Sequence, residues 1–347
     1  MYLKKTLWAV AILGLLICGF VAFQIYSAIF SPNTRFANEQ AFVFIPSEAS
    51  FSEVKRTVSP LLKNAETFEA VAERKGYITN IKGGKFPIDK GMNNNEIINS
   101  LRSNNLPVKV SFNNQESLAS LAGRISKQIE ADSLSLFEAF NDADFLQQTG
   151  FTEDSKLGMY LPNTYELFWN TSATDFRERM YREYKKYWNP ERLQKAKKLK
   201  LTPNKVIALA AIVQKETVKT EERPRVAGVY LNRIKKNIAL QADPTVIFAI
   251  KKETGNYDTI IKRVLYRDLE MDSPYNTYKY VGIPPGPIAM PDISSIEAVL
   301  NPEKHDYLFF VANVSNFGYH IFAKTLAQHN RNKVQYTRWL DSQKIRR

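Results

Sequence analysis

The chain has 347 residues, which is enough for about two domains. It carries 48 Lys and Arg against 35 Asp and Glu, a net charge of +13, so an acidic partner such as nucleic acid, an anionic membrane surface or an anionic polymer is expected. No zinc-finger, RRM or basic-region signature favours nucleic acid, and the most basic stretch, residues 177–205, is typical of a solvated helix face. The single cysteine, Cys18, excludes an intramolecular disulfide.

The first predicted element is an uncharged segment, residues 6–30. At 1.5 Å per residue, a helix of this length crosses a bilayer with some tilt. Lys4 and Lys5 precede it, so we expect a cytoplasmic N-terminus, residues 1–5, and a single pass through the cell (inner) membrane. The rest of the chain is then periplasmic or extracytoplasmic. The segment is longer than the apolar core of a signal peptide and lacks a small-x-small exit, so we predict an uncleaved anchor.

A small α+β unit is predicted after a polar linker at residues 31–40. Its strands are expected at residues 41–46, 83–88 and 107–112. Its helices are expected after Ser52 as a cap, up to Gly76, and over residues 93–105. This unit, residues 41–112, has few candidate catalytic groups.

A larger, helix-rich α+β domain is predicted over residues 113–347. Its first part is mostly amphipathic helix. Pro203 opens a helix that carries Glu216, and Pro224 opens the next one. Loops are expected to dominate after Ala239. A β-hairpin follows at residues 307–323, and the last element is a helix at residues 325–343.

Several kinds of chemistry lack their sequence signatures. There is no G-x-S-x-G, and the only cysteine lies in the membrane segment. The histidines, His305, His320 and His329, are not part of an H-E-x-x-H helix. No Walker loop or dinucleotide fingerprint is present. We therefore expect neither a metal nor a cofactor.

Glu216 is the candidate acid, because it follows a run of small apolar residues. Successive helical residues turn about 100°, so Glu216 shares a face with Leu209, Ile212 and Val213, whereas Gln214 points about 200° away. A carboxyl group in apolar surroundings has a raised pKa, as a general acid requires near neutral pH. The polar residues that follow Glu216 leave open the alternative that it ends the helix and turns to solvent.

Three later stretches, "LQADPT", "SPYNTY" and "GIPPGP", are rich in short polar side chains, tight turns and aromatic residues. Tyr and Asn side chains stack on sugars and hydrogen-bond to them, and loops stiffened by proline lose little entropy on binding. The composition of these loops does not reveal whether they meet Glu216.

Four motifs in order, "AAIVQKET…ERPRVAGVYLNRI…LQADPTVIFAI", "SPYNTYKYVGIPPGPIAMP", "YLFFVAN" and "GYHIFAKTLAQHN", resemble the YceG-like family, endolytic murein transglycosylases of the MltG type. The resemblance runs from about Ala41 to the C-terminal helix. It implies that residues 41–112 are a LysM-like peptidoglycan-binding module and that residues 113–347 are the catalytic domain. The sequence departs from the family pattern at Gln214, where a second glutamate is usual, and at Asn163, where aspartate is more common.

The resemblance implies cleavage of MurNAc–GlcNAc β-1,4 bonds within nascent glycan strands, leaving 1,6-anhydroMurNAc ends and terminating glycan elongation. A lytic transglycosylase needs one carboxyl group where an ordinary glycosidase needs two, and Glu216 is that group. The candidates for binding sugar are Gln241, Asp243, Tyr275, Asn276 and Tyr278. Asp243 precedes a proline and is equally suited to capping the following helix.

The expected partners are peptidoglycan glycan strands and peptidoglycan synthases of the division or elongation machinery, with no nucleic acid. Two other functions remain open. One is a catalytically silent wall-binding scaffold, and the other is a hydrolytic glycosidase that uses Glu216 with Asp243.

Overall fold

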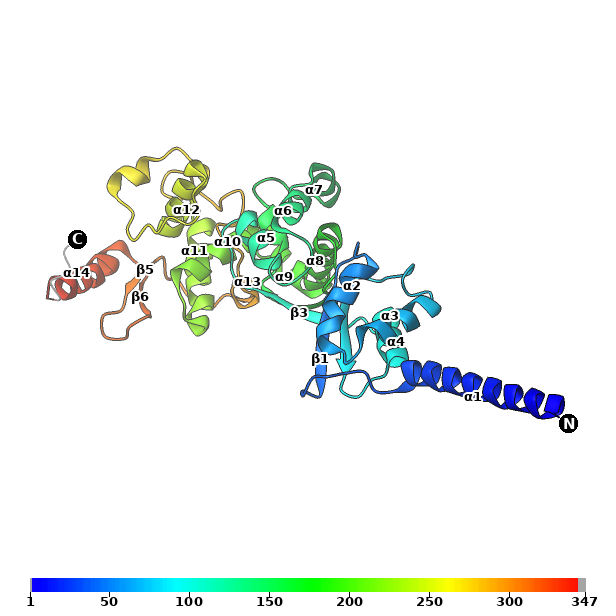
Figure 1. Cartoon of the computed structure of the whole chain (residues 1–347). Coiled ribbons are helices and arrows are strands. Elements are labelled where there is room, and N and C mark those ends of the chain that lie inside the picture. The colour runs from blue at the N-terminus through cyan, green and yellow to red at the C-terminus, as the bar shows by residue number, and fades with distance from the viewer. Residues whose placement is uncertain (1, 343–347) are drawn as a thin grey trace. The chain divides into compact units, whose positions relative to one another are not determined.

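The computed structural model describes residues 2–342, which form a mixed fold of helices and small sheets, as predicted (Figure 1). The chain divides into two compact units. The first contains the chain up to Val110 with Lys127–Ala131 and Tyr165–Ser172, and the second contains Ser111–Ser126, Asp132–Thr164 and the chain from Ala173 onward. The strands form three two-stranded sheets, β1 with β2, β3 with β4 and β5 with β6. Residues 343–347, the end of the predicted C-terminal helix and domain, lie outside the described residues.

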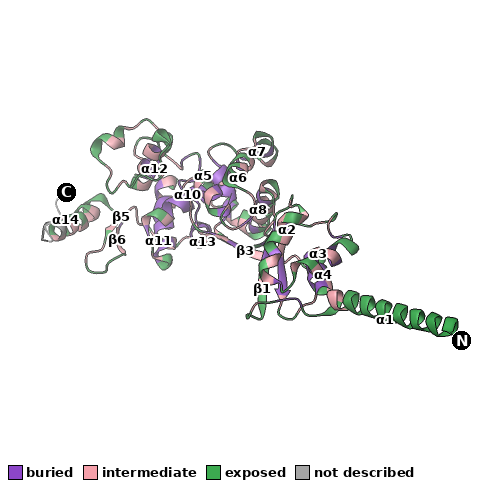
Figure 2. Ribbon diagram, viewed as in Figure 1, coloured by how far each residue is buried: buried purple, intermediate pink, exposed green. Residues whose placement is uncertain are grey.

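The N-terminal helix α1 (Tyr2–Phe30) is exposed along almost its whole length (Figure 2). It is long and apolar enough to cross a membrane, so it is compatible with a single-pass anchor. Its last turn packs on the first unit through Ala28 and Ile29. The buried side chain of Asn94 donates to the carbonyl oxygen of Ala28 at 2.8 Å, which fixes the end of the helix.

The predicted strands and helices of the small unit are all present. In chain order they are β1 (Gln40–Ile45), α2 (Phe51–Val58), a 3₁₀ turn (Ser59–Leu61), α3 (Ala65–Arg74), β2 (Gly84–Asp89), α4 (Asn94–Ser103) and β3 (Pro107–Phe112). Strands β1 and β2 are antiparallel, with Val43 opposite Phe86 in the core. The cap of α2 differs from the prediction. Ser50 takes this place instead of Ser52, because it forms a capping box with Glu53.

Residues 31–40, the predicted linker, are attached to the first unit. Asn33 and Thr34 are buried. The amide nitrogen of Asn33 donates to Oδ1 of Asn94 at 2.6 Å, and Thr34 forms an antiparallel bridge with Leu62. These contacts hold the segment between α1 and β1 in place.

The remaining helices and strands follow in chain order: α5 (Leu118–Ile125), α6 (Ser133–Phe140), α7 (Ala143–Thr149), a 3₁₀ turn (Lys156–Met159), β4 (Asn163–Phe168), α8 (Ala173–Tyr187), α9 (Pro190–Lys198), α10 (Pro203–Glu216), a 3₁₀ turn (Thr220–Glu222), α11 (Arg223–Lys235), α12 (Asp243–Thr254), a 3₁₀ turn (Tyr266–Glu270), α13 (Ile293–Leu300), β5 (Phe309–Ala312), β6 (His320–Ala323) and α14 (Leu326–Ser342). The predicted hairpin is confirmed as β5 and β6. Helices α12 and α13 lie where the sequence was expected to be mostly loop.

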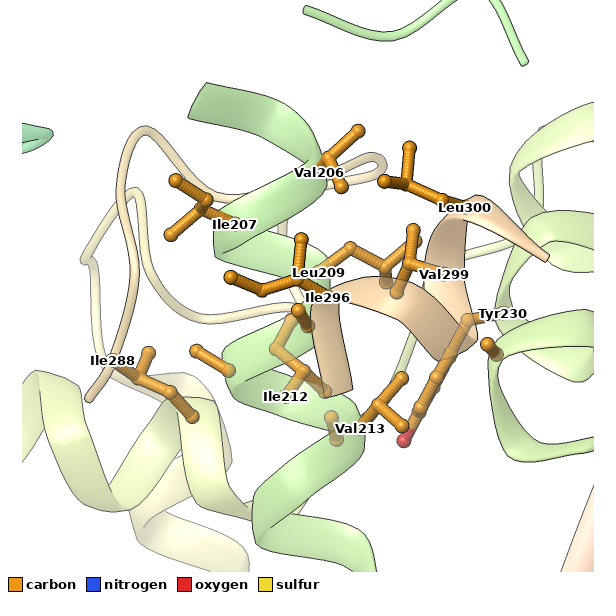
Figure 3. Close-up of a cluster of buried hydrophobic side chains, with 14 of the residues drawn as sticks. Val206, Ile207, Leu209, Ile212, Val213, Tyr230, Ile288, Ile296, Val299 and Leu300 are labelled. Carbon is orange, nitrogen blue, oxygen red and sulfur yellow. The ribbon is translucent and has the colours of Figure 1, made fainter. Parts of the chain in front are cut away.

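Helix α10 is the centre of the second unit. Thr202 caps it by accepting from the backbone of Lys205, and Pro203 occupies the first turn. All residues from Val206 to Val213 are buried, so neighbouring elements cover the helix on every side. It packs against α11, α12 and α13, and Figure 3 shows its side chains facing those of α13. This packing fixes the position of the residue at its C-terminal end, Glu216.

Candidate active site

Glu216 is the last residue of α10, and its side chain is partly buried. The Tyr230 hydroxyl donates to Oε1 of Glu216 at 2.7 Å. The pKa of Glu216 is raised to about 7, chiefly by burial and also by the charge of Asp243, while the hydrogen bond from Tyr230 opposes this rise. The carboxyl group is therefore poised to give up or accept a proton near neutral pH. Glu216 therefore does not simply turn to solvent at the end of the helix, which was the alternative left open by the sequence.

Tyr230 is a site residue that the sequence analysis did not identify. It lies on α11, is 1% exposed, and packs edge-on against Phe310 of β5, with 5.9 Å between the ring centroids. A tyrosine buried on a helix face needs a partner for its hydroxyl, and this requirement was the available signal. The partner could not be identified because it lies on a different helix.

Asp243 and Tyr278, both predicted to bind sugar, are in direct contact. The Tyr278 hydroxyl donates to Oδ1 of Asp243 at 2.5 Å. Asp243 is exposed and is the first residue of α12, whose N-cap is Ala242 without a side-chain hydrogen bond. Asp243 therefore does not cap the helix, and that alternative is wrong. Its carboxylate interacts electrostatically with Glu216, so the two acids belong to one site.

Gln241 joins the same cluster through a buried arginine. Nη2 of Arg233 on α11 donates to Oε1 of Gln241 at 2.6 Å. Arg233 is 7% exposed, and burial lowers its pKa. The backbone of Gln241 lies in the left-handed region, at φ 54°, and its N–H donates to the carbonyl oxygen of Thr277. This bond ties the "LQADPT" stretch to the "SPYNTY" stretch.

Tyr275 and Asn276 are predicted sugar-binding residues that the structure places inside the second unit. Both are fully buried. The Asn276 amide donates to the carbonyl oxygens of Leu269 and Met271, each at 2.8 Å, and its Oδ1 accepts from the backbone of Tyr278 at 3.0 Å. Direct contact between these two residues and a sugar would require this loop to move, and that contact stays a prediction.

The "GIPPGP" stretch passes close to the backbone of another loop. A Cβ atom on Gly286 would lie 1.7 Å from the carbonyl oxygen of Asp154 and 3.1 Å from the Tyr275 hydroxyl. The Tyr275 hydroxyl itself donates to Oδ1 of Asp154 at 3.1 Å. Only glycine permits this approach, so the motif fixes the loop behind Tyr275.

Gln214 points away from Glu216, as the helical geometry predicts. Its Oε1 accepts from the backbone of Asp292 at 2.5 Å and from the Ser295 hydroxyl at 3.2 Å. It therefore supports the N-terminus of α13. These contacts explain how an amide can occupy position 214 without a contact to Glu216.

A cavity of about 250 Å³ is lined by Lys215 and Pro244, the sequence neighbours of Glu216 and Asp243, but not by either acid itself. Its other lining residues are Glu116, Ile247, Phe248, Lys251, Asp258, Thr259, Ile260, Ile261 and Ile288. Glu116 accepts from Lys215 at 2.5 Å and from Lys251 at 2.6 Å, so these three charges are paired. The cavity offers mainly an apolar surface next to the site.

Within residues 2–342, no group of three or more His, Cys, Asp or Glu side chains is arranged to hold a metal ion. His320 instead pairs with the buried Glu222, with 2.7 Å between Nδ1 and Oε2. The site so far described consists of acids, tyrosines, an amide and a buried arginine. In this set Glu216 can transfer protons, and the other polar side chains can hydrogen-bond to a polar ligand.

Comparison with known proteins assigns the chain to a family. The model of the YceG-like family matches residues 43–335. The chain belongs to the YceG-like family.

The relatives of this YceG-like chain include enzymes with a named activity. It is 31% identical to an endolytic murein transglycosylase of Bacillus subtilis (strain 168), over 91% of this chain and 90% of the relative. It is 28% identical to an endolytic murein transglycosylase of Streptococcus pneumoniae (serotype 2), over 86% of this chain but only 59% of the relative. A crystal structure of a YceG-like protein from Listeria monocytogenes is 28% identical, with a TM-score of 0.57 over 85% of this chain and 99% of that one.

Proposed function

We propose that this chain is a membrane-anchored endolytic murein transglycosylase in which Glu216 is the only acid–base catalyst. The observation that carries the proposal is the position of the Glu216 carboxyl group at the end of the buried helix α10, where the Tyr230 hydroxyl donates to it. Burial is the main cause that raises the pKa of this group, to about 7. The names of relatives at 28–31% identity support the reaction class. The anchor, the cytoplasmic N-terminus and the extracytoplasmic catalytic domain belong to the same proposal.

The protonated Glu216 starts the reaction. Because Tyr230 donates to Oε1, the acidic proton is carried by Oε2. This proton passes to the bridging oxygen between MurNAc and GlcNAc as the bond from that oxygen to C1 of MurNAc breaks. The resulting carboxylate then takes the proton of the 6-hydroxyl of the same MurNAc while that oxygen bonds to C1. The product is a 1,6-anhydro end, and no water is consumed.

The side chains around Glu216 fall into two groups in this proposal. Gln241, Asp243 and Tyr278 are on the accessible side of the cluster and bind the glycan. Tyr275 and Asn276 position the loop that carries Tyr278, since their polar groups are already engaged. Fixing Tyr278 in this way limits the entropy lost when sugar binds.

The predicted division at residue 112 is also part of the proposal. Residues 41–112 act as a LysM-like wall-binding module and residues 113–347 as the catalytic domain, which acts beside peptidoglycan synthases and ends glycan elongation. Removing residues 41–110 is expected to weaken sedimentation with purified wall material more than it slows bond cleavage. Equal losses of both in a folded protein would contradict a separate binding module.

A hydrolytic glycosidase is the second candidate, because Asp243 is a second carboxylate in electrostatic contact with Glu216. In that mechanism Asp243 would activate water or act as the nucleophile. The contact between Asp243 and the Tyr278 hydroxyl favours a positioning or binding role. The two mechanisms leave different ends on the product.

The test is a single digest of purified glycan strands by the full chain in water enriched in ¹⁸O, followed by mass spectrometry. We expect every new end to be 1,6-anhydroMurNAc without ¹⁸O. New reducing ends that carry ¹⁸O would establish the hydrolase instead. Wall binding without any new ends would establish the silent scaffold.

A further inference from the structure

The orientation of the Gln241 side chain is fixed by its neighbour. Nη2 of Arg233 lies 2.6 Å from Oε1 of Gln241, and Arg233 is buried. A guanidinium group only donates hydrogen bonds, so the oxygen of the amide must face it. The opposite orientation would place donors against donors. The Nε2 group of Gln241 therefore faces away from Arg233.

Gln241 and Asp243 belong to one cluster of side chains at the surface. Both are exposed, and Arg233, the partner of Gln241, interacts electrostatically with Tyr278, the partner of Asp243. Oδ1 of Asp243 accepts from Tyr278. Among the described residues, neither Nε2 of Gln241 nor Oδ2 of Asp243 has a hydrogen-bond partner. This surface thus offers one donor and one acceptor, two residues apart.

An acetamido group matches this pair, because it carries one acceptor, its carbonyl oxygen, and one donor, its N–H. We propose that Gln241 and Asp243 recognise the N-acetyl group of the sugar bound beside Glu216, with Nε2 of Gln241 donating to the carbonyl oxygen and Oδ2 of Asp243 accepting from the N–H. This inference rests on the proposed function, since it takes the ligand to be an N-acetylated glycan. Arg233 is a positioning residue that keeps the amide in the donating orientation.

The test compares binding of two probes to the full chain in detergent. The probes are a β-1,4-linked N-acetylglucosamine hexamer and the same hexamer without acetyl groups, at a pH at which the freed amine is uncharged. Isothermal titration gives the ratio of the two dissociation constants. One hydrogen bond contributes about five- to tenfold, so the wild-type chain should prefer the acetylated hexamer by at least this factor.

Two variants isolate the donor. Gln241→Glu keeps the shape and an acceptor for Arg233 but replaces the Nε2 donor with an acceptor, and Gln241→Met removes the amide without adding charge. Both should lower the preference about five- to tenfold, with unchanged circular dichroism. The control Gln194→Glu makes the same change at an exposed position on α9 and should leave the preference as in wild type.

A wild-type preference in both Gln241 variants would overturn the inference. Cleavage of glycan strands, measured on the same preparations, separates this outcome from a failure of the proposed function. If strands are cleaved to anhydro ends and the preference does not depend on Gln241, only the inference fails. If the preference depends on Gln241 and no strand is cleaved, only the proposed function fails.

Discussion

Tyr230→Phe tests how the structure sets the acidity of Glu216. The substitution removes the hydroxyl that donates to Oε1 at 2.7 Å and keeps the ring that packs on Phe310. This hydrogen bond lowers the pKa of Glu216. A hydrogen bond to a charged group contributes about 1.5–3 kcal/mol, and one pKa unit corresponds to 1.36 kcal/mol. The pKa of Glu216 should therefore rise from about 7 by roughly one to two units.

The pH dependence of kcat/KM reports this change, because it follows the free enzyme. The reaction starts from the protonated acid, so activity falls as the pH rises through the pKa of Glu216. In Tyr230→Phe this falling limb should move to higher pH by roughly one to two units. The plateau value of kcat/KM should be lower than in the wild type, because Glu216 becomes a weaker acid. Tyr266→Phe, which removes a hydroxyl from a residue that is 88% exposed, is the control. A limb that stays at the wild-type pH would refute the assigned role of Tyr230.

Three further substitutions address stability. Between pH 4.5 and about 7 the folded chain keeps a proton on Glu216 that the unfolded chain releases, so the free energy of unfolding of the wild type falls by about 3 kcal/mol as the pH rises through this window. Glu216→Gln should lack this fall when melts at pH 4 and pH 8 are compared. An equal change of stability with pH in the wild type and the variant would contradict the raised pKa. Gly286→Ala should lower the free energy of unfolding by about 3 kcal/mol or more through overpacking, whereas Gly123→Ala, with nothing within 4 Å of the new Cβ, should not destabilise the chain. Gln214→Ala should keep most of the activity, and its free energy of unfolding should fall by about 0.5–2 kcal/mol, as for a lost helix cap. A folded variant without activity would contradict the supporting role of Gln214.

Local sequence was enough to predict most of the elements and the position of Glu216, but not the helices α12 and α13. The helix that carries Glu216 could be predicted because Thr202, Pro203 and the apolar run are contiguous. The cap of α2 was misplaced by two residues, although the sequence distinguishes the two serines. Ser50 has Glu53 three residues later, as a capping box requires, whereas Ser52 has Lys55 at that distance.

Asp243 and Tyr278 were candidates from the sequence, but the contacts within the site could not be predicted because the contacting residues lie on separate elements. Tyr230 lies on α11, and Asp243 and Tyr278 are brought together by α12 and the following loop. An asparagine side chain can hydrogen-bond to a sugar, yet the side-chain amide of Asn276 donates to two backbone carbonyl oxygens. Burial distinguishes such supporting residues from residues that a ligand can reach. The burial of a single loop residue cannot be predicted from the residues next to it in the sequence.

The most direct test of the account is the rate at which Glu216→Gln forms 1,6-anhydro ends on purified glycan strands. The amide has nearly the shape of the acid but supplies no proton. The rate should fall by about 10²- to 10⁴-fold or more, since the same group also acts as the base. Glu253→Gln, an exposed position on α12, should cut at the wild-type rate. A folded Glu216→Gln protein that cuts at a near wild-type rate would contradict the assignment of the catalytic acid.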